Sequence, residues 1–311
     1  MSGPRGSHAR VSSELVTIRD WIRYANTEFD RAELHYGHGT DEPWDEAVAL
    51  VGGWLRVPPD RLEPMLDARL TAAEGEALAA AIRRRVEERI PVPYLVGRAW
   101  QIGVEFIVDE RVLIPRSPIA QLLDEGLDPW LGDASPRRIL DLCTGSGCLG
   151  ILAALAWPDA EVVLADVSAD ALAVAARNVE RFALGDRVHT LASDGLAAIA
   201  SDAQFDLVLC NPPYVDAADL AAMPAEFRHE PSLALAGGED GLDLVAAWLP
   251  QLASRMDRDG LLVLELGNSA PALGRRFPGL PLVWPELEQG GAGVVLVRGE
   301  DLAELGAADD P

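Results

Sequence analysis

Apolar residues in the first third of the chain recur every three or four positions, which is the spacing of one face of an α-helix. The first such stripe consists of Ile18, Trp21, Ile22, Ala25 and Phe29. A later helical run begins at the capping-box pair Thr71 and Glu74 and ends at Arg89, just before the helix-breaking Pro91. This pattern predicts an N-terminal helical domain over residues 12–90.

The pattern becomes extended after this domain. Between Tyr94 and Pro115, β-branched and aromatic residues lie on both sides of Gly103, which is typical of two strands joined by a tight turn. We therefore expect residues 91–116 to form a β-hairpin linker.

After Pro136, short apolar runs alternate with helical stretches. The runs predicted as strands are residues 138–142, 161–165, 188–192, 205–209 and 261–266. Such alternation predicts right-handed crossovers and a mostly parallel sheet covered by helices on both faces. Pro281–Leu287 and Gly293–Val297 have no helix between them, and they predict an antiparallel terminal hairpin at one edge. Residues 117–300 are thus expected to form a Rossmann-like, doubly wound α/β domain.

A glycine-rich turn follows the first predicted strand of this domain, with the sequence Asp141-Leu-Cys-Thr-Gly-Ser-Gly-Cys-Leu-Gly150. Glycine lets the backbone turn tightly between strand and helix, and it lets a ligand approach without a side chain in the way. The N-terminus of the following helix can receive a carboxylate or a phosphate. The residues of the turn predicted to contact a cofactor are Thr144, Gly145, Ser146 and Gly147.

Carboxylates near the ends of three strands indicate which cofactor this is. Asp141 suits a cationic group, such as the amino group of S-adenosylmethionine, and is unfavourable beside a pyrophosphate. Asp166 can accept both hydroxyls of a ribose, and Asp194 is placed to meet an adenine amino group. The Gly-x-Gly-x-x-Gly pattern alone also suits a nicotinamide or flavin enzyme, and Asp166 fits either ligand. Asp141 favours the methyl donor.

The fourth predicted strand leads directly into Asn211-Pro212-Pro213-Tyr214. Ligands of open α/β sheets bind beyond the carboxyl ends of the strands, so we expect this motif beside the glycine-rich turn. The side-chain oxygen of Asn211 and the carbonyl of Pro212 can accept both hydrogens of a planar NH2 group. Tyr214 can pack against the flat face of that group.

This arrangement answers a chemical difficulty, because the lone pair of an amide nitrogen is delocalised and complete loss of that resonance costs about 18–20 kcal/mol. Two acceptors that pull on the hydrogens bias the nitrogen toward attack without a general base. Alignment of nitrogen, methyl carbon and sulfur adds up to about 7–11 kcal/mol in well-oriented systems. Asn211, Pro212 and Tyr214 are the predicted catalytic residues, and Asn211 also borders the cofactor. The alternative interpretation is an ordinary turn after a strand.

Four stretches resemble the protein glutamine N-methyltransferases that modify translation factors and ribosomal proteins. They are Ile114–Arg116, Leu140–Cys148, Asn211–Tyr214 and Gly237–Asp243. The likeness runs from about Glu14 to Arg298. It implies S-adenosylmethionine as cofactor, contacts to it from the turn around Gly145 and from Asp166, and substrate contacts from Asn211, Pro212, Pro213 and Tyr214. It also implies that the N-terminal domain chooses the protein partner.

Release-factor methyltransferases of this family usually continue Pro-Arg with Pro-Asp/Glu-Thr-Glu, whereas this chain has Ser117-Pro-Ile-Ala120. That segment is similar to the sister group that methylates large-subunit ribosomal protein L three. The other segments similar to that group are Thr17–Trp21, Tyr36–Asp41, Pro43–Ala47, Phe227–Pro231 and Glu288–Val294.

Composition narrows the choice of partner. The 311 residues carry a net charge of −24 without a single lysine, and a negative field repels phosphate backbones and favours a basic partner. We expect a basic large-subunit ribosomal protein as substrate, and we expect neither direct nucleic-acid binding nor a membrane. Three cysteines make no disulfide framework, and no secretory or membrane-spanning apolar stretch is evident, so a cytoplasmic protein is predicted.

Several alternatives stay open at this stage. The substrate can be a release factor, or the same motif can present an adenine amino group, although base flipping calls for a cationic binding surface. The chain can also be a ribosome assembly module that binds without catalysis. No metal site is expected, because no histidine lies at ligand spacing from Cys143, Cys148 or Cys210, and His35 and His38 fall in a segment interpreted as a structural or partner-recognising loop.

Overall fold

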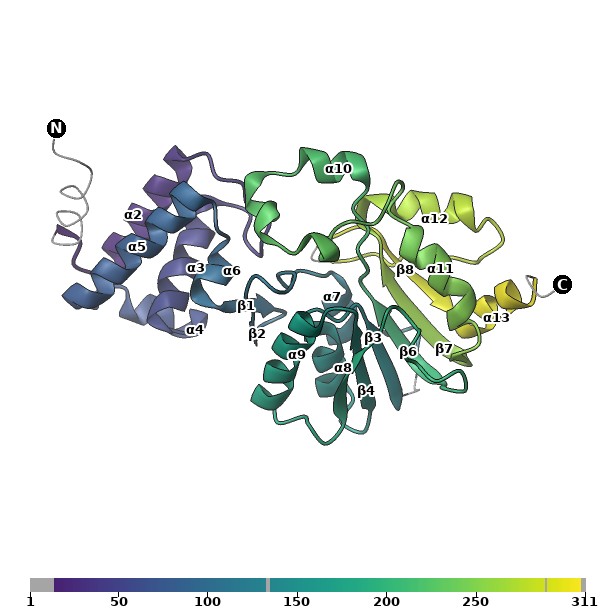
Figure 1. Cartoon of the computed structure of the whole chain (residues 1–311). Helices are drawn as coiled ribbons and strands as arrows, with labels where there is room; N and C mark the ends of the chain where they lie inside the picture. The colour runs from purple at the N-terminus through teal and green to yellow at the C-terminus, as the bar shows by residue number, and fades with distance from the viewer. Residues whose placement is uncertain (1–13, 133–134, 289, 309–311) are drawn as a thin grey trace. The chain divides into compact units, whose positions relative to one another are not determined.

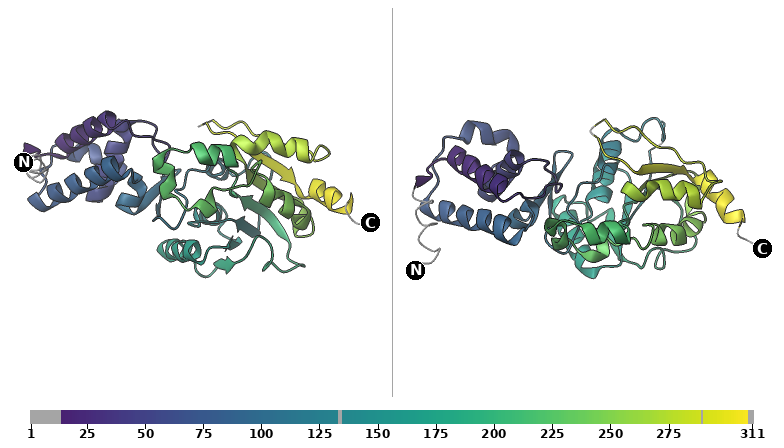
Figure 2. Two further views of the ribbon diagram at one scale, coloured as in Figure 1. Left: turned by 45° about the horizontal axis from the view of Figure 1, so that its top comes forward. Right: turned by 90° about the horizontal axis from the view of Figure 1, so that it is seen from above.

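The computed structural model describes residues 14–132, 135–288 and 290–308, and it divides into two compact units (Figures 1 and 2). The helical unit consists of the described residues up to Ala99 together with Pro224–His229. The sheet unit consists of Trp100–Met223 and of the described chain from Glu230 onward. No helix in the described ranges is long and apolar enough to cross a membrane.

Helices of the helical unit pack around one apolar core. They are α2 (Ile18–Arg31), α3 (Pro43–Leu55), α4 (Pro59–Leu62), α5 (Ala72–Glu88) and α6 (Val92–Val96), with the 3₁₀ turn η1 (Glu63–Met65). The stripe predicted on α2 is confirmed, since all five of its residues are buried. The capping box is also confirmed, because Thr71 and Glu74 each accept a hydrogen bond from the other's backbone N–H.

Pro224–His229 contains the 3₁₀ turn η2 (Ala225–His229), which packs into the helical unit although it follows the Asn-Pro-Pro-Tyr motif in sequence. Glu226 is buried and accepts hydrogen bonds from the backbone N–H of His35 and from Arg89. The ring of Phe227 lies 4.3 Å from that of His38, centroid to centroid. Two segments of the helical unit that are far apart in the sequence, the loop with His38 and the turn with Phe227, therefore pack together.

The segment predicted as a hairpin linker forms strands only around its centre. Strands β1 (Arg98–Gln101) and β2 (Val104–Ile107) form a two-stranded sheet around Gly103. The expectation of extended structure from Tyr94 is wrong, because Val92–Val96 is helix α6. Pro91 precedes this short helix and Pro93 lies in its first turn, where proline costs no hydrogen bond, and Gly97 ends it at φ 70°.

The sheet unit contains six strands in the order β5-β4-β3-β6-β7-β8. Their bounds are β3 (Arg138–Leu142), β4 (Glu161–Asp166), β5 (Val188–Ala192), β6 (Phe205–Cys210), β7 (Met256–Glu265) and β8 (Val294–Arg298). The first five are parallel to their neighbours, and β8 pairs antiparallel with β7. The mostly parallel, doubly wound α/β fold expected from the sequence is confirmed.

Helices cover both faces of this sheet (Figure 1). Buried residues of α7 (Ile119–Asp124), α8 (Cys148–Ala156) and α9 (Ala169–Arg181) join one core, which takes Ile139 and Leu209 from the sheet. The helices on the opposite face are α11 (Asp243–Leu252), α12 (Ala270–Arg276) and α13 (Gly299–Ala308). The connections also contain α10 (Ala217–Ala222), η3 (Ser232–Ala234) and η4 (Gly267–Ser269).

The terminal hairpin differs from its prediction. Gly293–Val297 corresponds to β8, but Pro281–Leu287 is not a strand and contributes a single bridge, Val283 to Leu296. Pro281 and Pro285 lack the N–H that a ladder needs, which accounts for the short pairing. Strand β8 at this edge of the sheet therefore has β7 as its antiparallel partner.

Candidate functional site

The strand order reverses between the neighbouring strands β3 and β6. From β3 the chain adds β4 and β5 on one side of the sheet, and from β6 it adds β7 and β8 on the other side. Such a switch point leaves a crevice beyond the carboxyl ends of the two strands. A cavity of about 530 Å³ lies there, and it is lined by residues of the sheet unit alone. The glycine-rich turn after β3 and the Asn-Pro-Pro-Tyr motif after β6 both border it, as the sequence predicted.

Backbone geometry explains the glycines of the turn. Gly145 has φ 55° and Gly147 has φ 82°, values that side chains disfavour. A Cβ on Gly150 would lie 2.2 Å from the Leu164 side chain, so this glycine lets α8 approach the sheet closely. Thr144, Gly145 and Ser146 line the cavity, whereas the described lining omits Gly147.

Asp141 lies beneath the turn and is almost fully buried. One of its carboxylate oxygens accepts hydrogen bonds from the Thr144 hydroxyl at 2.5 Å and from the Gly150 N–H at 2.9 Å. Desolvation raises the pKa of Asp141 to about 7, against the lowering effect of these two donors. The described lining of the cavity leaves Asp141 out, and its carboxylate holds the turn through Thr144 and Gly150, so a contact with the amino group of a cofactor stays a prediction.

Asp166 occupies the cavity floor at the end of β4. Its two oxygens accept one backbone N–H each, from Gly145 and from Ser168, both at 2.9 Å. A carboxylate oxygen has a second lone pair, so each can accept a further hydrogen bond from a ligand. Asp194, which follows β5, is exposed and also lines the cavity.

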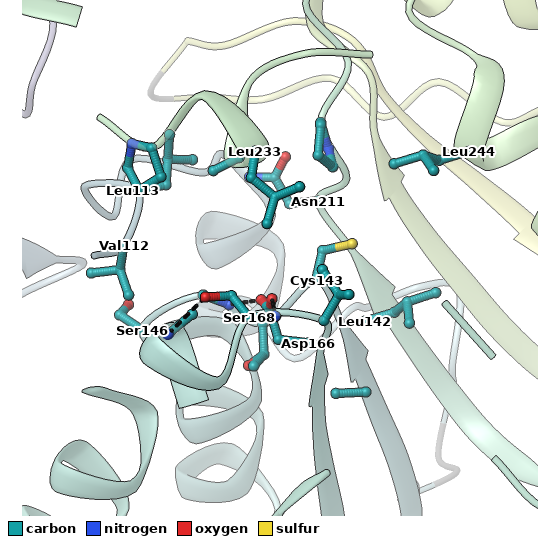
Figure 3. Close-up of a pocket in the computed structure, with 18 of the residues that line it drawn as sticks. Val112, Leu113, Leu142, Cys143, Ser146, Asp166, Ser168, Asn211, Leu233 and Leu244 are labelled. Atoms are coloured by element: carbon teal, nitrogen blue, oxygen red, sulfur yellow. Dashed lines mark hydrogen bonds between the residues drawn. The ribbon is translucent and has the colours of Figure 1, made fainter. Parts of the chain in front are cut away.

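Asn211 faces the cavity across from Asp166 (Figure 3). Pro213 lines the cavity as well, whereas Pro212 is buried and Tyr214 is half-buried, and neither is part of the described lining. The Tyr214 hydroxyl donates to Glu265 at 2.8 Å, and the Ser269 hydroxyl donates to the Tyr214 carbonyl at 2.9 Å. Asn211 and Pro213 therefore border the cavity directly, and the contacts of Pro212 and Tyr214 with an amide stay a prediction.

Apolar walls of the cavity come from residues that sequence reasoning did not single out. They are Val112, Leu113, Leu233, Leu244 and Trp248, and Figure 3 shows the first four of them around the space between Asn211 and Asp166. Trp248 of α11 packs so closely on Gly195 that a Cβ there would lie 2.2 Å from the indole nitrogen. No local sequence motif identifies these residues. The family-like stretch Gly237–Asp243 directly precedes Leu244, and it was the signal that could have pointed to this part of the cavity wall.

The cysteines near the site are neutral thiols. Burial raises the pKa of Cys148 to about 12, and it also raises the pKa of Cys143 and of Cys210 far above the ordinary range. A neutral thiol is a poor nucleophile, and Cys143 and Cys148 are among the residues that line the cavity.

Comparisons with known proteins give the family. Residues 120–238 match the model of the methyltransferase small domain. Over 290 residues the chain is 50% identical to the ribosomal protein uL3 glutamine methyltransferase of Bordetella pertussis (strain Tohama I), covering 93% of this chain and 97% of that protein. It is 45% identical over 293 residues to the protein of the same name from Burkholderia pseudomallei (strain K96243), covering 92% and 95% respectively.

Solved structures share the fold. The hMettl16 catalytic domain, crystallised with the MAT2A 3′UTR hairpin 6, superposes with a TM-score of 0.50 at 18% identity, covering 72% of this chain and 80% of that one. Identity this low supports the architecture of the sheet unit and nothing more specific.

Proposed function

The chain belongs to the family of ribosomal protein uL3 glutamine methyltransferases, and we propose that it transfers a methyl group from S-adenosylmethionine to the side-chain amide nitrogen of a glutamine in uL3. The observation that carries the proposal is the position of Asn211, which faces Asp166 across one cavity. A site for a cofactor and a site for a planar NH2 group thus share one space.

The cavity suits S-adenosylmethionine, which supplies an electrophilic methyl group on a sulfonium sulfur. Asp166 has a free lone pair on each oxygen for the ribose hydroxyls, and the space above Gly145 is open, since a Cβ there would meet no atom within 4 Å. Asp194 can accept from the adenine amino group. Trp248 and Leu244 offer an apolar wall for the purine ring.

The glutamine amide is held by acceptors. The Asn211 side-chain oxygen and the Pro212 carbonyl each take one N–H, which draws electron density toward the nitrogen and orients its lone pair at the methyl carbon. A bond forms between amide nitrogen and methyl carbon as the bond between that carbon and sulfur breaks. The sulfur keeps the electron pair and becomes a neutral thioether, and the amide nitrogen releases one proton to water.

The acidic chain fits a basic substrate. A net charge of −24 gives a long-range field that attracts a basic ribosomal protein and repels RNA. This field supports free uL3, or uL3 surfaces that RNA does not cover, as the target. We infer that the helical unit contributes to partner choice, because none of its residues belongs to the described lining of the methyl-transfer cavity.

Labelled S-adenosylmethionine tests the function against its alternatives. Ribosomes and uL3 from cells that lack this enzyme are incubated with the purified chain and the labelled donor. Label in uL3 is the expected result. Label in a release factor or in RNA would replace the proposed substrate, and bound but untransferred donor would indicate a non-catalytic assembly module.

A further inference from the structure

Glu265 is a buried carboxyl group at the end of β7, the strand next to β6. The parallel register pairs Leu264 with Cys210, so Glu265 lies beside the beginning of the Asn-Pro-Pro-Tyr motif. The described lining of the cavity leaves Glu265 out, and methyl transfer as proposed above makes no use of it. A buried carboxyl group at this place therefore calls for its own explanation.

Each oxygen of Glu265 receives a hydroxyl group. The Tyr214 hydroxyl donates to Oε1 at 2.8 Å, and the Ser117 hydroxyl donates to Oε2 at 2.5 Å. The pKa of Glu265 is raised, because burial outweighs the lowering effect of the two hydroxyls and of the nearby Arg116. Two donors aimed at one carboxyl group match its ionised form, which only accepts.

Tyr214 is fixed at three points, of which the contact with Glu265 holds the end of the ring. The Ser269 hydroxyl donates to its backbone carbonyl, and Gly267 lies against the ring, where a Cβ would be 2.6 Å from the Tyr214 Cε2 atom. Burial and the Glu265 charge raise the pKa of the Tyr214 phenol, so it stays a neutral donor. A change in the χ1 angle of Tyr214 would carry the hydroxyl away from Glu265 and leave a buried carboxylate oxygen without this donor.

We propose that Glu265 is a positioning residue for methyl transfer, which fixes the direction of the Tyr214 side chain through the phenol and is itself oriented by Ser117. The proposal rests on the proposed function in one respect, the role of Tyr214 beside the reacting amide. Small changes in ring position shift the neighbouring Pro212 carbonyl and Asn211 side chain, and misplacement of a reacting group by about 1 Å can cost about 100-fold in rate.

Three conservative variants test this network: Glu265→Gln, Tyr214→Phe and Ser117→Ala. We expect Glu265→Gln and Tyr214→Phe each to lower kcat on uL3 by roughly 10- to 100-fold, with the Kd of S-adenosylmethionine within about twofold of the wild-type value. The double variant Glu265→Gln/Tyr214→Phe should be no slower than the slower of its two single variants, because without the phenol Glu265 has no Tyr214 hydroxyl to orient. Glu180→Gln, at an exposed carboxylate of α9, is the matched control and should keep wild-type kcat.

Urea midpoints of the wild type, Glu265→Gln, Tyr214→Phe and their double variant give a second double-mutant cycle that needs no substrate. The effects on these midpoints should be non-additive in the same way. Additive effects in both cycles, or a Glu265→Gln protein with wild-type kcat, would overturn the proposal. If Glu265→Gln does not fold, wild-type kcat in both Tyr214→Phe and Ser117→Ala would overturn it instead. Failure of the wild type and of Glu180→Gln to methylate uL3 would contradict the proposed function, while the urea cycle would still decide the coupling.

Discussion

Gly145 donates its backbone N–H to Oδ2 of Asp166 across 2.9 Å, which ties the glycine-rich turn after β3 to the end of β4. The second oxygen of Asp166 accepts the Ser168 N–H at the same distance. Because both donors belong to the backbone, the carboxylate is held by the fold itself and is ready for a ligand before one binds.

Replacement of Asp166 by alanine tests its role toward the cofactor. Loss of a charge-assisted hydrogen bond costs roughly 1.5–3 kcal/mol, so Asp166→Ala should raise the Kd of S-adenosylmethionine about 10- to 150-fold in titration calorimetry. Asp202→Ala removes an exposed carboxylate of the same unit and should leave the Kd unchanged. Equal affinity of the two variants would remove Asp166 from the cofactor site.

Asp141 predicts a pH dependence of stability. Its pKa is about 7 in the folded protein, above the ordinary value of an unfolded aspartate, mainly because burial disfavours the charge. Between roughly pH 4 and 7 the folded state therefore binds more protons than the unfolded state, and the free energy of unfolding falls as pH rises. Asp141→Asn cannot titrate, so urea unfolding should show a shallower fall across this window. A slope like that of wild type and of the exposed variant Asp202→Asn would contradict the assignment.

A buried ion pair stabilises the helical unit. Arg85 and Glu46 are both almost fully buried, with Nε and Oε2 3.0 Å apart. Arg85 keeps Glu226 at 3.6 Å and the His35 carbonyl as partners when Glu46 is removed, so Glu46→Ala should lower the free energy of unfolding by about 3 kcal/mol, the lower end of the cost of breaking a buried pair. The exposed Glu87→Ala on α5 should change it by less than about 0.5 kcal/mol. Similar denaturant midpoints for the two proteins would show that the pair has little net effect.

Hydrogen exchange on the intact chain tests partner recognition. On mixing with uL3, amides of α2 to α5 should gain protection, and association should slow as salt screens the attraction between acidic enzyme and basic substrate. Protection confined to the sheet unit would place partner choice there instead.

Local patterns predicted much of this structure because their physics is local. The Thr71–Glu74 capping box and the Asn-Pro-Pro-Tyr turn depend on residues within one stretch, and both lie where the sequence predicted. Contacts between residues far apart in the sequence could not be predicted from such local patterns. Trp248 joins the cavity wall, and Glu226 enters the helical unit, only through tertiary contacts. Asp141 lies next to the glycines as expected, but its burial and its hydrogen bond with the Thr144 hydroxyl follow from tertiary packing.

The proposed role of Asn211 is to hold the amide that receives the methyl group. It is tested most directly by tandem mass spectrometry of uL3 after single-turnover reaction with S-adenosylmethionine, using wild type and Asn211→Ala side by side. We expect one added methyl group on a glutamine side chain with wild type, little with Asn211→Ala, and nearly equal cofactor affinity for both. The wild-type rate should be almost flat across neutral pH, since no side chain serves as obligatory base. Methylation of another residue type, full activity of Asn211→Ala, or a steep rise in rate near neutrality that disappears on mutation of one histidine or acid would contradict it.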